Sequence, residues 1–155
     1  MPVRKMKEFL DTEGIKYVTI IHSPAFTAAE TAATAHIHGK GLAKVVMVKL
    51  DGDMAMAVVP STRKVDIALL REVTGADQVD IATEKQFRDL FSDCEAGAMP
   101  PFGNLYGMEV YVSADLSDNE DIAFNAGSHT ELVRMSYMDF ERLVNPKILV
   151  GSSWH

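Results

Sequence analysis

Several short segments of the chain are continuously apolar, aromatic or β-branched, which predicts a protein rich in β-strands. Residues 17–21 read Tyr-Val-Thr-Ile-Ile, and the apolar runs 43–50 and 54–59 are joined by Asp51-Gly52-Asp53. Such residues favour strands, and a glycine flanked by aspartates is typical of a hairpin turn. The same reasoning predicts further strands over residues 78–81, 108–113, 121–125 and 131–135, the last pairing with the one before it.

Helices are predicted between these strands. Residues 3–13 place Met6, Phe9 and Leu10 on one helical face, and Gly14 follows as a stop. Capping boxes begin two more helices, one from Thr27 to about residue 36 and one from Thr83 through residue 91. The remaining helices are predicted over residues 64–73 and from residue 136 to just before Pro146. The pattern predicts one α+β domain over residues 1–155, built around a mixed sheet.

Composition narrows the class of protein. The chain has 155 residues, of which 47% are hydrophobic, but no apolar run approaches the roughly 18–20 residues that span a bilayer. The acidic residues Glu8 and Asp11 stand where a signal peptide needs apolar residues, and Cys94 is the single cysteine, so we expect a cytoplasmic protein without a membrane partner. The net charge of −7 argues against extended clamping of nucleic acid, although a few local cations can still contact an RNA end.

The loop Gly97-Ala98-Met99-Pro100-Pro101-Phe102-Gly103 is the first candidate for chemistry. Prolines fix the backbone, and glycines allow a ligand to approach it closely. Such a loop can offer backbone groups to a substrate carbonyl and to an attacking water. A rigid connector between two elements is the competing interpretation.

Lys44 and the turn Asn125-Ala126-Gly127-Ser128-His129 are the other candidates. Lys44 begins an apolar strand, so it can reach into a pocket to hold a phosphate or carboxylate, or it can cover apolar surface while its head reaches water. His129 can act as a general base, orient a substrate group, or simply stand in solvent.

Two other kinds of site are less favoured. His36 and His38 have no Cys or carboxylate partner at a convincing spacing, so we expect no metal and no cofactor. Cys94 precedes the proline loop and could be a nucleophile, but a buried structural cysteine is the favoured interpretation.

Taken in order, these segments resemble the YbaK / prolyl-tRNA-synthetase-associated domain family of aminoacyl-tRNA deacylases. Gly41-Leu42-Ala43-Lys44-Val45-Val46 is similar to the family's strand with its signature lysine. Gly97-Ala98-Met99-Pro100-Pro101 matches its G-x-x-x-P loop, and Phe124-Asn125-Ala126-Gly127-Ser128-His129 resembles its late glycine turn. The resemblance covers roughly residues 6–144 and implies a mixed, partly barrel-like sheet surrounded by helices.

The resemblance implies a trans-editing hydrolase that removes a small amino acid (alanine, serine, threonine or cysteine) from the acceptor CCA end of mischarged tRNA. Lys44 would hold the phosphate or terminal nucleotide, while Gly97 and Pro101 would shape the loop that positions the ester and its water. The aminoacyl pocket would be lined by Gly127, Ser128 and His129, with Thr27, Val46 and Asn125 as neighbours. The ribose hydroxyl of the RNA would assist the attack, without a metal. Because the chain is acidic, a synthetase or an elongation factor would help to deliver the tRNA.

Two other functions stay open at this point. The chain could be a non-catalytic module that binds a nucleotide, an RNA end or a partner protein on the same fold, in which case it would bind the acceptor end without loss of the ester. It could also hydrolyse another small ester or thioester, which an assay with a free aminoacyl ester would separate from tRNA editing.

Overall fold

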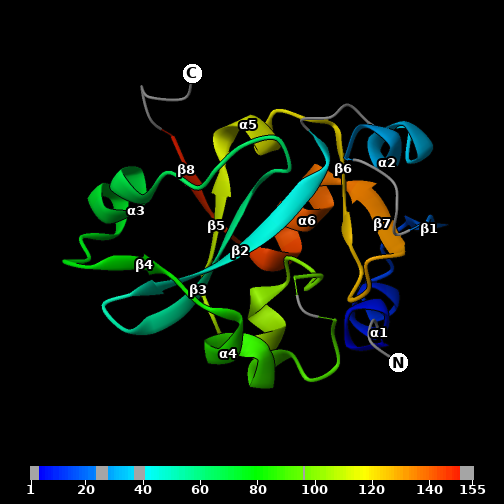
Figure 1. Cartoon of the computed structure of the whole chain (residues 1–155). Helices are drawn as coiled ribbons and strands as arrows, with labels where there is room; N and C mark the ends of the chain where they lie inside the picture. Colours follow the sequence, from blue (N-terminus) through cyan, green and yellow to red (C-terminus); the bar gives the residue numbers. More distant parts are fainter. Residues whose placement is uncertain (1–3, 24–27, 37–40, 96, 151–155) are drawn as a thin grey trace.

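Eight strands form two sheets in the computed structural model, which describes residues 4–23, 28–36, 41–95 and 97–150 (Figure 1). The smaller sheet has the strand order β1 (Tyr17–Ile21), β7 (Glu131–Ser136) and β6 (Asp121–Asn125). The larger sheet has the order β4 (Val79–Ile81), β2 (Ala43–Leu50), β3 (Asp53–Pro60), β5 (Val110–Ser113) and β8 (Lys147–Leu149). The predicted class, α+β with a mixed sheet, is confirmed, but the strands form two sheets that do not close into a barrel.

The larger sheet is mixed because its two halves are built differently. Strands β2 and β3 form the predicted hairpin, and β4 adds to β2 in antiparallel fashion. Strands β5 and β8 instead continue the sheet from β3 in parallel pairing. A parallel bridge between Leu42, just before β2, and Ala123 on β6 links the two sheets. This link brings the start of β2 close to the end of β6.

Helices cover the sheets and complete the core (Figure 1). The α-helices are α1 (Arg4–Thr12), α2 (Ala28–Thr34), α3 (Ile67–Thr74), α4 (Glu84–Phe87), α5 (Ala114–Ser117) and α6 (Tyr137–Val144), and 3₁₀ turns span Arg88–Phe91 and Gly103–Tyr106. The rings of Phe102, Phe124 and Phe140 are fully buried, and each pair is in contact at centroid distances of 5.6–6.5 Å. Phe102 therefore anchors the end of the proline loop in the core.

Most predicted elements are present, with differences that have local causes. The third helix begins at Ile67 rather than residue 64, because the Asp66 side chain accepts a hydrogen bond from the backbone N–H of Leu69 and caps the helix. The helix predicted through residue 91 becomes a 3₁₀ turn at Arg88. Strand β8 and helix α5 were not predicted. The proposed cap of α2, Thr27, lies outside the described residues.

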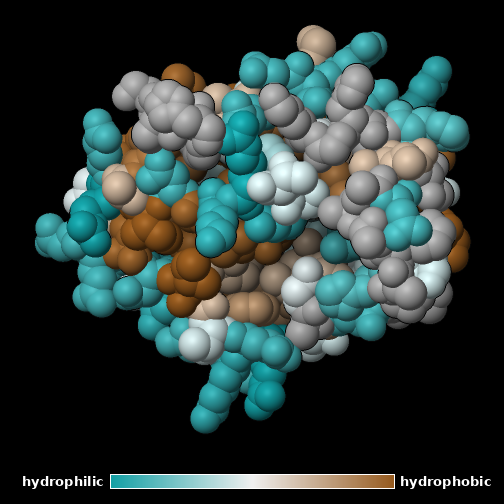
Figure 2. Space-filling view, turned by 45° about the horizontal axis from the view of Figure 1, so that its top comes forward, coloured by the Kyte–Doolittle hydropathy of each residue, from teal (hydrophilic) through white to brown (hydrophobic). Residues whose placement is uncertain are grey.

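Figure 2 shows the molecule with the upper end of Figure 1 turned forward. Apolar side chains gather near the middle of this face, and polar side chains surround them. Among the described residues, the helices are all too short or too polar to cross a membrane.

Candidate active site

A pocket of about 530 Å³ lies beside the bridge that joins the two sheets. It is formed by the start of β2, the ends of β1, β3 and β6, helix α2, strand β7 and the loops near residues 95 and 129. Ten residues line it: His22, Thr31, Leu42, Ala43, Lys44, Ser61, Glu95, Asn125, His129 and Leu132. Segments that are distant in sequence thus bring three of the predicted site residues, Lys44, Asn125 and His129, to one pocket.

Lys44 enters the pocket from the second position of β2, where it lies opposite Val59 of β3. Its side chain is half-buried, and no acidic group in the described part of the chain forms an ion pair with it. A half-buried ammonium without a carboxylate partner is available to an anionic ligand. Val46, two residues further along β2, instead packs against the hydrophobic cluster that contains Val48 and Leu69, and it does not line the pocket.

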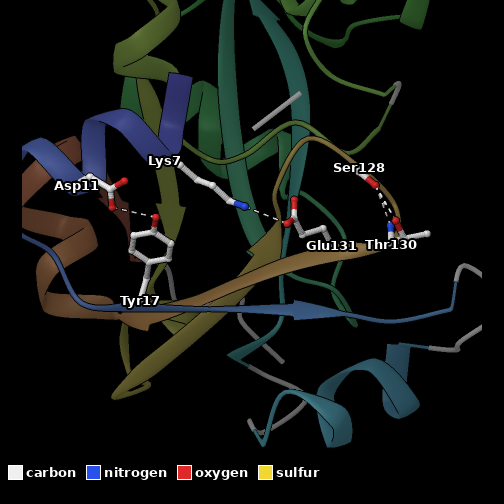
Figure 3. Close-up of polar contacts among 6 residues, drawn as sticks. All are labelled: Lys7, Asp11, Tyr17, Ser128, Thr130 and Glu131. Carbon is white, nitrogen blue, oxygen red and sulfur yellow. Dashed lines mark hydrogen bonds and ion pairs between the residues drawn. The ribbon is translucent and has the colours of Figure 1, made fainter. Parts of the chain in front are cut away.

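The turn after β6 forms another part of the pocket wall. Asn125 is half-buried and lies opposite Leu132 of β7. Gly127 has φ +91°, a conformation that favours glycine, and is buried. The Ser128 hydroxyl lies 2.9 Å from that of Thr130 and accepts a 3.1 Å hydrogen bond from the Thr130 backbone N–H (Figure 3). These bonds hold the turn in a defined shape.

The turn is also fixed at its base by an ion pair from α1. Lys7 lies 3.0 Å from Glu131, the first residue of β7 (Figure 3). The backbone carbonyl of Glu131 accepts a 3.0 Å hydrogen bond from the Ala126 N–H, which closes the turn across its neck. Helix α1 therefore supports the wall of the pocket without lining it.

The proline loop docks on this turn through backbone hydrogen bonds. The Glu95 N–H donates to the Gly127 carbonyl at 2.8 Å, and the Gly127 N–H donates to the Ala98 carbonyl at 2.9 Å. Gly97 lies between them with φ +79°, and a Cβ atom placed on it would stand 3.6 Å from Cε1 of His129. Gly97 and His129 are thus adjacent. Pro101 is buried, next to the core residue Phe102, and does not itself line the pocket.

Glu95 is the main residue that the sequence reasoning missed. Its Oε1 accepts a 3.0 Å hydrogen bond from the backbone N–H of His129, and it also bonds the Ser128 side chain. Both bonds lower the pKa of Glu95, the bond from the His129 backbone more than the bond from Ser128, and the charge of the His129 ring lowers it further. A single glutamate before a glycine carries no recognisable motif, so only the fold could identify it.

Further lining residues also escaped prediction. Thr31 on α2 is buried, and the hydroxyl oxygen of Ser61 is buried with no hydrogen-bond partner among the described residues. The Ser61 backbone N–H donates to the Leu42 carbonyl at 2.7 Å, which places the serine beside the start of β2. These hydroxyl groups give the pocket hydrogen-bonding capacity beyond its two charged residues.

Cys94 precedes the pocket residue Glu95 in the chain, but its thiol is not reactive at neutral pH. Burial, followed by the charge of Asp93, raises the pKa of its thiol to about 11, so the thiol is protonated at neutral pH. Its sulfur contacts Asp93 at 3.6 Å and the Tyr106 hydroxyl at 3.9 Å, and Cys94 is not among the pocket-lining residues. This environment fits a structural cysteine.

Two of the histidines, His22 and His129, line the pocket. His36 is exposed with φ +55°, and His38 lies outside the described residues, as does Thr27. Within the described ranges, no group of three His, Cys, Asp or Glu side chains is arranged to hold a metal ion.

Comparisons with known proteins identify the family of the chain. The model of the aminoacyl-tRNA editing domain family matches residues 22–143. The multifunctional Ser/Thr-tRNA deacylase ProXp-y of Escherichia coli is 23% identical over 94% of this chain and 90% of its own length. A crystal structure described as a candidate trans-editing enzyme for prolyl tRNA synthetase superposes with a TM-score of 0.81 at 19% identity, covering 95% of this chain and 94% of that one.

A second solved structure, of a hypothetical protein, also has a TM-score of 0.81, at 20% identity and with 94% of this chain and 97% of that one covered. At these identities the structural likenesses establish the fold, whereas the family match covers most of the chain and includes every pocket-lining residue. The predicted kinship with aminoacyl-tRNA deacylases is therefore confirmed, and the chain belongs to the aminoacyl-tRNA editing domain family.

Proposed function

We propose that this chain is a trans-editing hydrolase that removes a small amino acid of the alanine, serine, threonine and cysteine class from mischarged tRNA. The observation that carries the proposal is the pocket that Lys44, whose ammonium has no acidic partner among the described residues, lines together with Asn125 and His129. The end of an aminoacyl-tRNA matches this pocket, because it joins an anionic phosphate, which Lys44 can bind, to a small aminoacyl ester.

In this proposal Lys44 binds the phosphate of the terminal nucleotide. The loop at Gly97 and Pro101 positions the ester through its backbone, and the turn of Gly127, Ser128 and His129 forms the aminoacyl side, where His129 lines the pocket and Gly127 and Ser128 shape the turn. A water oxygen adds to the ester carbonyl carbon, the bond from that carbon to the ribose oxygen breaks, and the proton from the water passes to the departing ribose oxygen. Preorganised donors toward the carbonyl oxygen stabilise the developing negative charge.

The polar lining favours serine and threonine within this class. Thr31, Ser61 and Asn125 place two hydroxyl groups and an amide in the pocket, and the Ser61 hydroxyl has no partner in the described structure. A substrate hydroxyl would satisfy such groups, while alanine would leave them without a partner. The deacylase from Escherichia coli, whose name specifies Ser/Thr-tRNA, supports the same choice.

Delivery of the tRNA belongs to the same proposal. With a net charge of −7, the chain has little general attraction for RNA. A synthetase or an elongation factor that holds the body of the tRNA would present the acceptor end, so that the pocket needs to bind only the terminal nucleotide and its ester.

A panel of tRNAs charged with alanine, serine, threonine, cysteine and proline tests the proposal. We expect loss of serine and threonine from tRNA in the presence of the enzyme, with slower loss of alanine and retention of proline. Binding of the acceptor end with every ester left intact would instead support the non-catalytic binding module. Hydrolysis of a free aminoacyl ester but of no charged tRNA would indicate a general esterase.

A further inference from the structure

Two opposite charges line the same pocket without pairing with each other. The Lys44 ammonium projects from β2 and the Glu95 carboxylate from the loop after the 3₁₀ turn, and the structure forms no ion pair between them. Side chains that could neutralise each other but stay apart leave space for a ligand with a charge at each end. An aminoacyl-tRNA terminus has this form, with phosphate on one side of the ester and an α-ammonium group on the other.

The Glu95 carboxylate is held in place before any ligand arrives. Its Oε1 accepts the His129 backbone N–H at 3.0 Å, the Ser128 side chain bonds it as well, and its own backbone N–H is bonded to the Gly127 carbonyl. A carboxylate has about four lone-pair positions, so these two side-chain contacts leave acceptor capacity for a further donor. Its lowered pKa keeps it ionised in neutral solution.

The position of Glu95 along the loop fits the geometry of the ester. Gly97, two residues later, lies against the ring of His129. An ester placed between Lys44 and this part of the loop would direct its α-ammonium group toward Glu95, because that is the pocket's acidic side chain among the described residues. An ammonium group donates three hydrogen bonds, and a charged pair of this kind is stronger than a neutral one.

We propose that Glu95 binds the α-ammonium group of the aminoacyl ester and thereby restricts hydrolysis to esters whose amino group is free. The inference rests on the proposed function and adds a specificity-determining residue to it. An N-acylated aminoacyl ester has lost both the charge and two of the donors, so it gains nothing from Glu95. Such esters include peptidyl-tRNA, which an editing enzyme must leave intact.

Glu95→Gln is the informative variant, because its amide oxygen can still accept the His129 N–H while the charge is lost. The assay measures kcat/KM for seryl-tRNA and for N-acetyl-seryl-tRNA with the wild type, Glu95→Gln and Glu95→Ala. The control is Glu72→Gln, the same chemical change at an exposed position on α3. Melting temperatures show that each variant is folded.

We expect the wild type and Glu72→Gln to prefer seryl-tRNA. Because the Glu95 side chain is exposed to solvent, Glu95→Gln should lower kcat/KM for seryl-tRNA roughly two- to fivefold and leave the N-acetylated substrate unchanged, so that the preference collapses. An equal loss on both substrates would overturn the inference, since Glu95 would then act only as a tie between loop and turn. No loss on either substrate would overturn it too. A wild type that deacylates no charged tRNA would reject the proposed function itself, which makes the two failures distinguishable.

Discussion

The backbone N–H of His129 donates a 3.0 Å hydrogen bond to Oε1 of Glu95, which lies 34 residues earlier in the chain. Together with the two backbone bonds between Gly127 and residues 95 and 98, it joins the proline loop to the glycine turn. The two segments that resemble known editing motifs are therefore one structural unit. A substitution in either segment should therefore alter the conformation of the other.

The pKa of Glu95 tests whether the hydrogen bonds that join the two segments are formed. Hydrogen bonds from His129 and Ser128 to the charged carboxylate lower its pKa below 4.5, so its stabilising contribution is present above pH 4.5 and is lost as the pH falls through the lowered value. We expect side-chain NMR to show Glu95 titrating below the ordinary range of glutamate. Ser128→Ala should move its pKa upward, whereas an ordinary pKa in both proteins would contradict the bonding described here.

Gly97 tests the approach of the loop to His129. Because φ is +79° and a Cβ would stand 3.6 Å from the His129 ring, Gly97→Val should strain the backbone and press valine methyls against His129, which lines the pocket. The matched control is Gly75→Val, at φ +73° with nothing within 4 Å of its Cβ. We expect each variant to lose about 1–2 kcal/mol of unfolding free energy.

Their activities should differ. We expect Gly97→Val to lower deacylation roughly 10- to 100-fold, because a small displacement of reacting groups is costly, and Gly75→Val to keep the wild-type rate. Equal rates for the two variants in the deacylation assay, with equal melting temperatures, would show that Gly97 does not border the substrate.

Local pattern was enough to predict most of the elements. Residues 17–21, 43–50 and 121–125 are strands with the predicted bounds, because each carries its own apolar or β-branched signal. Strand β8 has three residues and forms through parallel pairing with β5, which is far away in the sequence. No local signal reports such a pairing.

The candidate site divides in the same way. Lys44, Asn125 and His129 stand in segments with distinctive sequences, and the fold brings them to one pocket. Glu95 and Ser61 have ordinary neighbours in the sequence, and their place in the pocket follows only from how the loops dock. Val46 shows the opposite case: the resemblance implies that it neighbours the aminoacyl pocket, yet it packs against the cluster that contains Leu69 of α3.

Cys94 is predicted to be dispensable for the reaction. A pKa of about 11 leaves about one thiol in a thousand ionised at pH 8, so alkylation by iodoacetamide should be much slower in the folded protein than after unfolding in urea. The raised pKa also means that the folded state loses stability as the pH rises from 9 toward 11. Cys94→Ala should keep full deacylation activity, and a folded but inactive variant would contradict this assignment.

Substitution of Lys44 tests whether this pocket deacylates tRNA. The measurement is the single-turnover rate of seryl- and threonyl-tRNA hydrolysis by the wild type and by Lys44→Met. Lys85→Met, which changes an exposed lysine on α4, is the control. We predict that Lys44→Met keeps the melting temperature but loses activity roughly 10- to 100-fold, as expected for a lost charged contact, while Lys85→Met matches the wild type. Full activity in folded Lys44→Met would show that deacylation does not depend on the Lys44 ammonium, and therefore that this pocket is not the site of the reaction as proposed.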